Sequence, residues 1–408
     1  MFSFDISATE NNARVGKLVT PHGTIQTPSF VPVATVATVK ALSPEDLCKL
    51  GSQVIITNAF HLHLRPGEDL IEDLGGLHRF MSWEGPLMTD SGGFQIFSLG
   101  SGKEHGVGKI APIFPEEKDR AGRRRPRRQS PLAKVDDDGV EFISYLDGSR
   151  HRSTPEQVVE IERKLGADIN LVLDECTSPL HDYDYTKEAT ERTHRWAVRA
   201  QAEFQRTSDK RQALFGIVQG GAYRDLREES ATFISKQDFD GYAIGGSLGR
   251  SKKEMYQVLE WTMPFLPQDK PRHLLGIGEI DDIFEIVRRG IDLFDCVLPT
   301  RMARTGTVLT KETDRFRVHV RNARFKDDPL PIEVGCTCFC CCNYSRAYLR
   351  HLFVTKDLLG VRLATIHNVH FLESLMRQIR LAIEEGRFLK LWKEWLSRIS
   401  GLHKRSER

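Results

Sequence analysis

The sequence lacks long hydrophobic stretches and lacks a strong excess of charge of either sign. No run approaches the roughly 20 apolar residues that a membrane-spanning helix requires. The first residues, MFSFDISATE, contain no charged segment followed by an apolar core, as a secretory signal would. The 408-residue chain has a formal net charge of only +2, so its overall charge indicates no particular partner. We therefore expect a cytoplasmic protein that is not held in a membrane.

Cysteine is scarce, and its distribution is uneven. The chain has eight cysteines, and five of them lie within the seven residues CTCFCCC at 336–342. Disulfides are rare in the cytoplasm, where clustered cysteines more often hold a metal ion, and structural zinc takes four such ligands. Spacing alone leaves several ligand choices open, which are Cys336 with Cys338 and Cys341, variants that use Cys340 or Cys342, and the histidines His351, His367 and His370.

The apolar runs predict an α/β fold with a parallel sheet. Eight short runs alternate with helical patterns, and continuous apolar runs are typical of strands that are buried on both faces. A strand–helix unit repeated about eight times fits a TIM (β/α)8 barrel. A doubly wound open sheet is the alternative, because periodicity alone cannot show that a sheet closes. The runs begin at Ser29, Val54, Pro86, Ile169, Ala213, Gly241, His273 and Leu293.

Helix signals lie between these runs. Ser43-Pro44-Glu45-Asp46 and Thr154-Pro155-Glu156-Gln157 each offer an N-cap, a proline at the first helical position and an acid in the first turn. Further helices are predicted near 187–206, 223–236, 251–265 and 281–289, and two amphipathic helices follow Phe371.

The regular pattern is interrupted at residues 101–140. This segment holds the basic run GRRRPRR and little apolar content, which predicts an inserted, mobile loop. The loop is either a solvated linker or a contact for an RNA backbone. We expect residues 1–305 to form the barrel and residues 306–398 to form the cysteine-containing subdomain with C-terminal helices. A frayed tail is expected at 399–408.

Acidic and amide side chains follow several of the predicted strands. Asp90, Asp174, Gln219 and Asp295 lie at the carboxyl ends of strands, where barrel enzymes gather their chemistry. Each alone could be a helix N-cap or an ion-pair partner. Together they favour one shared site, because an isolated acid beside an apolar strand costs stability. Carboxylates and an amide suit a purine-like edge, and two carboxylates can act as nucleophile and general acid/base in glycosyl transfer.

The residues around these acids also favour a flat ligand. In Asp90-Ser91-Gly92-Gly93-Phe94-Gln95, two glycines allow close approach to the backbone, and Phe94 either stacks on the ligand or belongs to the core. Gly245-Gly246 ends another strand in the same manner. Downstream of Asp295, Arg301 and Arg304 are three residues apart and suggest a clamp for phosphate or a nucleobase.

Taken in order, these motifs resemble the tRNA-guanine transglycosylases of bacterial type, also called queuine tRNA-ribosyltransferases. The match runs through TDSGGFQ, LDECT, FGIVQGG, YAIGG, FDCVLPTRMAR, the cysteine cluster and TIHN, and it leaves out mainly 101–140 and the tail. The resemblance implies a TIM barrel with a zinc-binding subdomain. It also implies exchange of guanine at the wobble position of tRNAs with GUN anticodons (those for Asp, Asn, His and Tyr) for a 7-deazaguanine, preQ1 or queuine, in queuosine modification.

The resemblance also implies individual roles. Asp295 is implied to attack the ribose C1′ and leave a covalent RNA–enzyme ester, while Asp90 handles the proton of the departing and incoming base. The residues implied to bind the base are Asp90, Ser91, Gly92, Gly93, Phe94, Asp174, Gln219 and Gly246. Those implied to contact the anticodon stem-loop are Gly276, Ile277, Gly278, Glu279, Ile280, Asp281, Asp282, Thr300, Arg301, Met302, Ala303 and Arg304. A homodimer is expected on the same ground.

Among the cysteines, the family pattern is C-x-C-x-x-C, one further residue and then N-Y-S-R, followed later by T-I-H-N. It selects one ligand set and implies one structural Zn²⁺ per chain with no position open to water. The implied ligands are Cys336, Cys338, Cys341 and His367.

One loop departs from the family pattern. Gly245–Arg250 reads GGSLGR where bacterial members typically read GGLAVGE, so the loop is one residue shorter and Arg250 stands where a glutamate is expected. In the family that glutamate helps to position a backbone carbonyl that recognises the aminomethyl group of preQ1. The exchange predicts an altered base preference, toward queuine itself.

Three other functions are compatible with parts of the sequence. A non-catalytic tRNA-binding partner subunit need not keep both acids, whereas Asp90 and Asp295 are both present. An archaeal-type enzyme that acts elsewhere in tRNA is expected to carry additional C-terminal RNA-binding domains after the zinc region. A zinc hydrolase on a barrel is disfavoured by a metal site with no open position.

Overall fold

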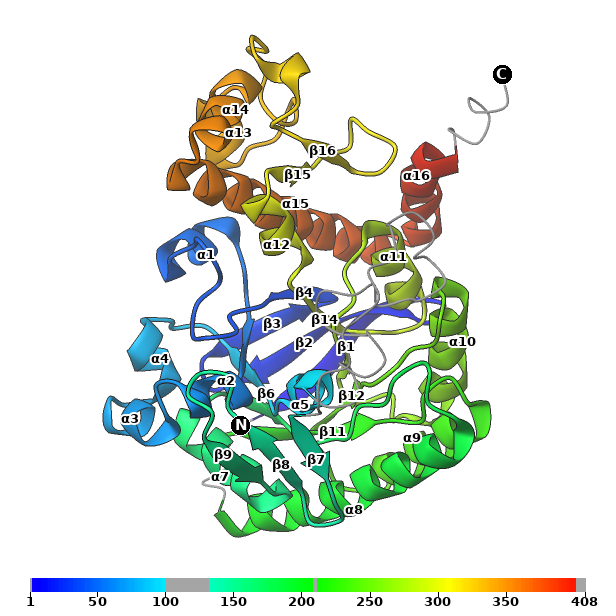
Figure 1. Ribbon diagram of the computed structural model, residues 1–408. Coiled ribbons are helices and arrows are strands. Elements are labelled where there is room, and N and C mark those ends of the chain that lie inside the picture. Colours follow the sequence, from blue (N-terminus) through cyan, green and yellow to red (C-terminus); the bar gives the residue numbers. More distant parts are fainter. Residues whose placement is uncertain (1, 100–131, 208–210, 401–408) are drawn as a thin grey trace.

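The barrel is built from eight parallel strands. The computed structural model describes residues 2–99, 132–207 and 211–400 (Figure 1). Within them one sheet has the order β4-β14-β13-β12-β11-β10-β6-β5. Its strands are β4 (Ser29–Pro32), β5 (Ile55–Asn58), β6 (Leu87–Asp90), β10 (Ile169–Leu171), β11 (Ala213–Val218), β12 (Gly241–Ile244), β13 (Arg272–Leu274) and β14 (Leu293–Cys296).

The first and last strands of this order also meet. Val33, directly after β4, forms a parallel bridge with Ile56 of β5. The Ala34 N–H donates to the Ile56 carbonyl oxygen at 2.7 Å. The sheet is therefore closed, which confirms the TIM barrel and excludes the open doubly wound sheet. Each of the eight predicted apolar runs coincides with one barrel strand, although β13 begins one residue before its run, because strands packed on both faces need apolar side chains.

Helices surround the barrel, and the predicted N-terminal signals begin two of them. Ser43 and Thr154 form capping boxes at the starts of α1 and α7, each with a proline in the first turn and a left-handed glycine at the end. The helices of this part are α1 (Pro44–Leu50), α2 (Ala59–Leu64), α3 (Glu68–Asp73), α4 (Gly76–Met81), α5 (Gly93–Leu99), α7 (Pro155–Leu165), α8 (Tyr183–Thr207), α9 (Arg224–Ser235), α10 (Lys252–Thr262), the 3-10 turn Met263–Phe265, α11 (Ile280–Arg288) and α12 (Leu298–Arg304).

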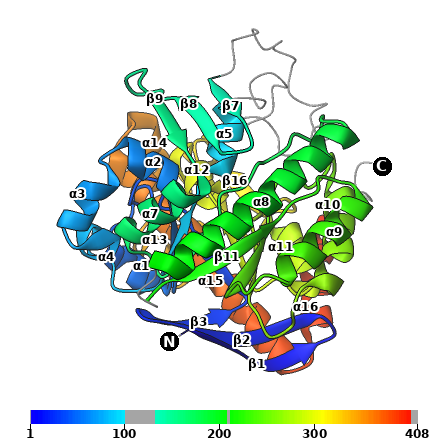
Figure 2. The same ribbon diagram turned by 90° about the horizontal axis from the view of Figure 1, so that it is seen from below.

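Two three-stranded antiparallel sheets, like the antiparallel pair β15 (Thr307–Leu309) and β16 (Arg317–His319) of the C-terminal part, were not predicted from the sequence. The first is formed by β1 (Ser3–Glu10), β2 (Ala13–Thr20) and β3 (Gly23–Thr27), and Figure 2 shows it beside α15 and α16. Buried Arg14 of β2 pairs with Asp292, which directly precedes β14, so this sheet lies against the amino-terminal end of the barrel. The second sheet is formed by β7 (Ala133–Val135), β8 (Val140–Ile143) and β9 (Arg150–Ser153).

The second sheet bears on the inserted loop expected at 101–140. Most of that segment, including the basic run GRRRPRR, lies outside the described residues. Its described part, 132–140, contains β7 and the first residue of β8 and is therefore a sheet rather than irregular chain.

The C-terminal part stands against one side of the barrel (Figure 1). Its long helix α15 contacts β1, β2 and β4 at one end and α13 and α14 at the other, so it joins the barrel to the cysteine-containing subdomain. Within the described ranges, no helix is long and apolar enough to cross a membrane. The elements are β15 (Thr307–Leu309), β16 (Arg317–His319), the 3-10 turn Ala323–Phe325, α13 (Phe339–Asn343), α14 (Arg346–Thr355), α15 (Leu358–Glu384) and α16 (Phe388–Ser400).

Candidate active site

The predicted acidic and amide residues lie at the carboxyl end of the barrel. Asp90 is the last residue of β6, Asp295 is the third residue of β14, and Gln219 directly follows β11. Asp174 comes three residues after the end of β10. Because the strands are parallel and neighbouring, their carboxyl ends share one face of the barrel, which is the face that holds the active sites of TIM-barrel enzymes.

Asp174 and Gln219 contact one another in the interior of this face. The Gln219 amide Nε2–H donates to Asp174 Oδ2 at 2.5 Å, and both side chains are buried. Two of the predicted glycines lie directly against this pair. A Cβ on Gly93 would come within 2.2 Å of Asp174 Oδ1, and a Cβ on Gly246 would come within 1.9 Å of Gln219 Oε1. The structure therefore brings these four predicted base-binding residues together, and only glycine fits at two of the positions.

Two polar atoms at this site are buried without a partner. The Ser91 hydroxyl and the Gln219 Oε1 atom make no hydrogen bond within the part of the chain that the structure describes. Most buried polar atoms in native proteins are hydrogen-bonded, and an unpaired one costs stability. The Ser91 hydroxyl and the Gln219 Oε1 atom are consequently available for hydrogen bonds to a bound molecule.

Burial and charge act together on Asp174. Burial, and secondarily the negative charge of Asp90, raise the pKa of the Asp174 carboxyl to about 7. The Cys176 thiol donates to the same carboxylate at 3.3 Å, and burial raises its own pKa well above the ordinary value. Asp174 thus changes charge near neutral pH, and a ligand that donates N–H groups to it favours the ionised form.

Asp90 is fixed by the neighbouring strand. The Asn58 side-chain amide, at the end of β5, donates to Asp90 Oδ2 at 2.5 Å. The two residues are register partners in the parallel ladder between β5 and β6. Asn58 was not predicted as a site residue. It could have been, because it is a polar residue at the end of the apolar run VIITN, and the acids were identified by the same kind of position.

Asp295 is held through one of its two carboxylate oxygens. His273 Nε2 lies 3.0 Å from Asp295 Oδ1, and the Gly276 backbone N–H donates to the same oxygen at 3.1 Å. Gly276 was predicted to contact RNA, and the structure places its amide on the predicted nucleophile. His273 was not predicted, because a histidine at the start of an apolar run resembles an ordinary strand residue.

Phe94 is partly exposed rather than buried in the core. It lies in the first turn of α5, its residue is 36% accessible, and its ring contacts Phe97 with centroids 5.8 Å apart. Phe94 is thus accessible to a bound molecule, and its stacking on a base stays a prediction.

The residues predicted to contact RNA fall into two groups. Arg301 and Arg304 are exposed on α12, whereas Thr300, Met302 and Ala303 are buried beneath them. Spacing of three places the two arginines on one face of the helix. The helix therefore presents guanidinium groups to solvent, and its other predicted residues serve as packing.

The segment from Gly276 to Asp282 shows the same division. Ile277, Ile280 and Asp282 are buried. Asp282 accepts a hydrogen bond from Tyr256 Oη at 2.7 Å and pairs with Lys252 at 3.0 Å. These side chains hold the start of α11 in place and are engaged within the protein.

Glu279 and Asp281, in the same segment, are paired as well. Glu279 pairs with Arg317 at 2.6 Å, and Asp281 pairs with Lys252 at 2.7 Å. The charged side chains of this segment are therefore engaged within the protein, and its predicted contact with RNA stays a prediction.

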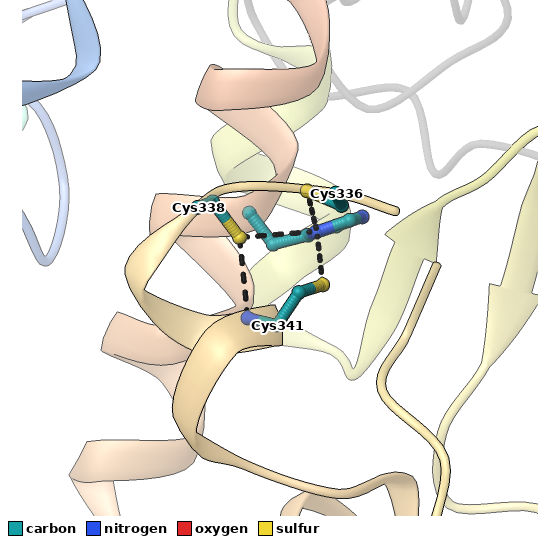
Figure 3. Close-up of side chains that lie close together, drawn as sticks. Cys336, Cys338 and Cys341 are labelled. Atoms are coloured by element: carbon teal, nitrogen blue, oxygen red, sulfur yellow. Dashed lines mark hydrogen bonds between the residues drawn. The ribbon is translucent and has the colours of Figure 1, made fainter. Parts of the chain in front are cut away.

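Three cysteines and one histidine converge near α13. Figure 3 shows Cys336, Cys338 and Cys341 turned toward one another on the turn before α13 and in its first turn. The His367 Nδ1 atom lies 3.8, 3.5 and 3.3 Å from their respective sulfurs. The four ligand atoms all lie within 4.8 Å of one another, so this cluster could hold a metal ion.

The remaining cysteines of the run take no part in this cluster. Cys340 is fully buried in the apolar core of the subdomain, and Cys342 is exposed. The choice of Cys336, Cys338 and Cys341 over the variants that spacing allowed therefore agrees with the geometry. His367, the residue expected from TIHN, provides the fourth group.

A second histidine–carboxylate group lies at the opposite end of the barrel. His22 Nδ1 and His78 Nε2 lie 2.7 and 3.3 Å from the two oxygens of buried Asp168, which directly precedes β10. The two imidazole rings are stacked, with centroids 3.6 Å apart and planes 18° apart. Nitrogen lone pairs in nearly parallel rings run side by side instead of converging on one ion. Since Asp168 also accepts the Leu87 N–H at 2.9 Å, we interpret this group as a hydrogen-bonded clamp.

The comparisons with known proteins agree with this combination of a closed barrel, strand-end carboxylates and a Cys3His cluster. The family model described as Queuine tRNA-ribosyltransferase matches residues 9–113 and 119–400. A queuine tRNA-ribosyltransferase of Desulforudis audaxviator is 49% identical over 390 residues, which cover 95% of each chain. Proteins of the same name from Herpetosiphon aurantiacus and Roseiflexus sp. are 48% and 47% identical, over 97% of this chain and 92% and 99% of their own.

The protein is thus a TIM-barrel protein with an appended cysteine–histidine subdomain. The chain belongs to the queuine tRNA-ribosyltransferase family, as its sequence motifs indicated.

Proposed function

We propose that this protein is a tRNA-guanine transglycosylase, which replaces guanine at the wobble position of GUN anticodons with a 7-deazaguanine in queuosine modification. The observation that carries the proposal is the group formed by Asp174, Gln219, Gly93 and Gly246. It offers a carboxylate and an unpaired amide oxygen beside two glycines, and the unpaired Ser91 hydroxyl lies two residues before Gly93 in the chain. Such a set matches the N–H donors and the carbonyl acceptor along the edge of a guanine.

The proposed chemistry divides between two carboxylates. Asp295 attacks the ribose C1′ of the target nucleotide, so that an oxygen–carbon bond forms while the C1′–N9 bond to guanine breaks. Guanine leaves with the electron pair of that bond and takes up a proton supplied through Asp90. The incoming base gives its N9 proton to Asp90 and displaces the Asp295 carboxylate from C1′. The RNA backbone stays intact, and protons and electrons balance over the cycle.

Trapping the ester tests this mechanism. The protein is incubated with a GUN anticodon stem-loop RNA and run on a denaturing gel. A slowly migrating RNA–protein band is expected with the native protein and not with Asp295→Asn. Absence of a band with the native protein, or an equal band with Asp295→Asn, overturns the mechanism. A non-catalytic partner subunit would give the first of these results.

The cysteine cluster is proposed to hold one structural zinc ion per chain. Zn–S bonds of about 2.3 Å and Zn–N bonds of about 2.0–2.1 Å in a tetrahedron place sulfur and nitrogen about 3.6 Å apart. The three distances from His367 Nδ1 to sulfur, between 3.3 and 3.8 Å, bracket this value. Zinc in such a site supplies folding stability to the subdomain, and it takes no part in base exchange.

The zinc-region surface supports the proposed homodimer. Tyr344 and Tyr348 stack with centroids 5.4 Å apart, and His351 continues the row. Phe339, beside them, is 57% accessible. Tyr348 and His351 are exposed while Tyr344 is partly buried, and an aromatic row of this kind is typical of a surface that is buried on association. Sedimentation of native protein and Tyr348→Asp tests the assignment, since a dimer that becomes monomeric supports it and a native monomer overturns it.

The base preference is proposed to be shifted toward queuine. Arg250 points its Nε–H to the Pro179 carbonyl oxygen at 3.3 Å, while its backbone N–H donates to Glu254 Oε2 at 2.6 Å. A glutamate at position 250 could not donate to Pro179, so the arginine holds this loop differently from the family pattern. The test measures the incorporation of preQ1 and of queuine into tRNA side by side, and a strong preference for preQ1 refutes the proposed preference for queuine.

We also propose that the protein is located in the cytoplasm.

A further inference from the structure

We propose that His273 is a positioning residue for Asp295, fixing one carboxylate oxygen so that the other is presented to the ribose. This inference rests on the proposed role of Asp295 as the nucleophile. His273 belongs to β13 and pairs in register with Leu293 of β14. Since side chains alternate along a strand, Leu293 and Asp295 lie on one face, and His273 points to that face from the next strand. Its Nε2 atom reaches Asp295 Oδ1 at 3.0 Å.

The surroundings of His273 decide which nitrogen carries the proton. The side chain is fully buried, and its Nδ1 atom has no hydrogen-bond partner among residues 2–99, 132–207 and 211–400. A proton on Nδ1 would leave a buried N–H unpaired and would aim the bare Nε2 lone pair at a carboxylate. A doubly protonated ring would leave an unpaired N–H on a buried cation. The neutral Nε2–H form avoids both costs and donates to Asp295.

This proton placement makes the Asp295 carboxylate asymmetric. Oδ1 accepts two hydrogen bonds, from His273 Nε2–H and from the Gly276 amide at 3.1 Å. No hydrogen bond to Oδ2 is found in the described parts of the chain, and the side chain is 16% accessible. Two fixed donors on Oδ1 stop rotation of the carboxylate and leave Oδ2 as the oxygen that reaches C1′. A group misplaced by about 1 Å can lose about 100-fold in rate, so this fixation bears directly on bond formation.

The Gly276 amide alone cannot supply the same restraint. It belongs to the loop after β13, with a left-handed backbone at φ +80°, whereas the His273 ring is enclosed in the barrel. A single donor permits the carboxylate to pivot about that hydrogen bond. The second donor, from a side chain that is itself immobilised by packing, defines the plane of the carboxylate.

A matched pair of variants tests the proposal. His273→Gln keeps an N–H donor near the position of Nε2, whereas His273→Met has nearly the same length and no donor. The measurement is the single-turnover rate of the Asp295–RNA adduct with the anticodon stem-loop, together with the dissociation constant of the RNA. We expect His273→Met to slow adduct formation by about 10- to 100-fold with unchanged RNA affinity. His273→Gln is expected to stay within about threefold of the native rate, as rescue by a conservative variant.

The outcomes separate this inference from the proposed function. Equal rates for the Gln and Met variants, or a native rate for Met, overturn the positioning role while leaving the nucleophile in place. No Asp295-dependent adduct with the native protein overturns the proposed function and this inference together. A further measurement needs no variant: the nitrogen spectrum of histidine-labelled native protein is expected to show the Nε2–H form of His273. The Nδ1–H form, which cannot donate to Asp295 from Nε2, would overturn the inference.

Discussion

The His367 ring donates through Nε2 to the Leu309 carbonyl oxygen at 2.6 Å. This hydrogen bond places the imidazole proton on Nε2 and directs the bare Nδ1 atom at the three sulfurs of Cys336, Cys338 and Cys341. A partner of this kind on the non-ligating nitrogen is usual for histidines that bind a metal, because it fixes the ring and its tautomer. Leu309 of β15 thus orients the His367 ring so that its Nδ1 atom can act as the fourth ligand of the cluster.

We predict that zinc depends on Cys341 and not on Cys340. Cys341→Ala removes one of four ligands, so the purified protein is expected to contain little zinc. Cys340→Ala removes a buried thiol from the apolar core, which costs some stability but leaves the ligand set complete. Zinc per chain by atomic emission measures both, with exposed Cys342→Ala as a control. Equal zinc contents in the Cys340 and Cys341 variants would contradict the ligand assignment.

Guanine binding is predicted to strengthen as the pH rises toward 7. Burial and the charge of Asp90 raise the pKa of Asp174 to about 7, and a base that donates N–H groups prefers the ionised carboxylate. Affinity is therefore expected to weaken about tenfold per pH unit below 7 and to level off above it. Calorimetric titration with guanine between pH 5.5 and 8.5 checks this. Asp174→Asn should bind weakly without this dependence, whereas Asp90→Asn should move the midpoint to lower pH.

The same pKa shift predicts an effect on stability. A carboxyl group whose folded pKa is raised stabilises the fold below its unfolded pKa of about 4, and this contribution is lost as the pH rises through about 7. Asp174→Asn is therefore expected to increase the free energy of unfolding at pH 8 relative to the native protein. Denaturant unfolding at pH 5 and pH 8 measures the difference, and a variant that is less stable at pH 8 contradicts the assignment.

Gly93→Ala is predicted to impair base binding and to lower the stability of the protein. Gly93 has a backbone conformation that alanine adopts, and it begins α5, where alanine favours the helix. The added Cβ would come within 2.2 Å of Asp174 Oδ1 and 2.5 Å of the Asp174 backbone carbonyl oxygen, so both the carboxylate and the chain at Asp174 have to move. We expect guanine affinity to fall about tenfold or more, and the displaced backbone to lower the melting temperature as well. Calorimetric titration with guanine and thermal unfolding measure the two effects, and a native guanine affinity contradicts the prediction.

Asp168→Asn is predicted to destabilise the barrel at neutral pH. Burial alone would raise the pKa of Asp168, but hydrogen bonds from His78 and His22 hold it below its usual value of 3.8. A lowered folded pKa contributes stability that is present above pH 3.8 and is lost as the pH falls below it. We expect a loss of about 1–3 kcal/mol at pH 7. Denaturant unfolding at pH 7 measures it, with exposed Asp327→Asn as the control, and similar losses in the two variants refute the clamp.

Much of the barrel was predictable because the signals for its strands and helices lie in short stretches of neighbouring residues. Continuous apolar runs identified all eight strands, and capping sequences identified the starts of α1 and α7. The N-terminal strand β1 was missed because its apolar residues Phe4, Ile6 and Ala8 alternate with polar ones instead of forming a continuous run, and none of them is fully buried. Helix α15 begins at Leu358, well before the predicted start, since His367 and its polar neighbours are buried by tertiary contacts that no sequence period shows.

The candidate site was predictable in its acids but not in the partners of those acids. A carboxylate at a strand end stands out from the apolar run before it, and this singled out Asp90 and Asp295. Asn58 and His273 act on them from neighbouring strands, and that adjacency depends on strand order and register. The family resemblance supplied roles for Asp90 and Asp295 that only the proposed experiments can test.

Helix α15 has a mechanical consequence for the whole protein. With 27 residues and a rise of about 1.5 Å per residue it is about 40 Å long. It carries His367 in its first half, and near its other end Arg380 donates to the Pro28 carbonyl oxygen at 2.7 Å, one residue before the first barrel strand. The cysteine–histidine cluster and the amino-terminal end of the barrel are thus connected by one continuous helix. Removal of zinc from the cluster by a chelator is therefore expected to destabilise strand β4 at the far end of the helix. The parts of the chain before and after residue 305 are then expected to unfold together.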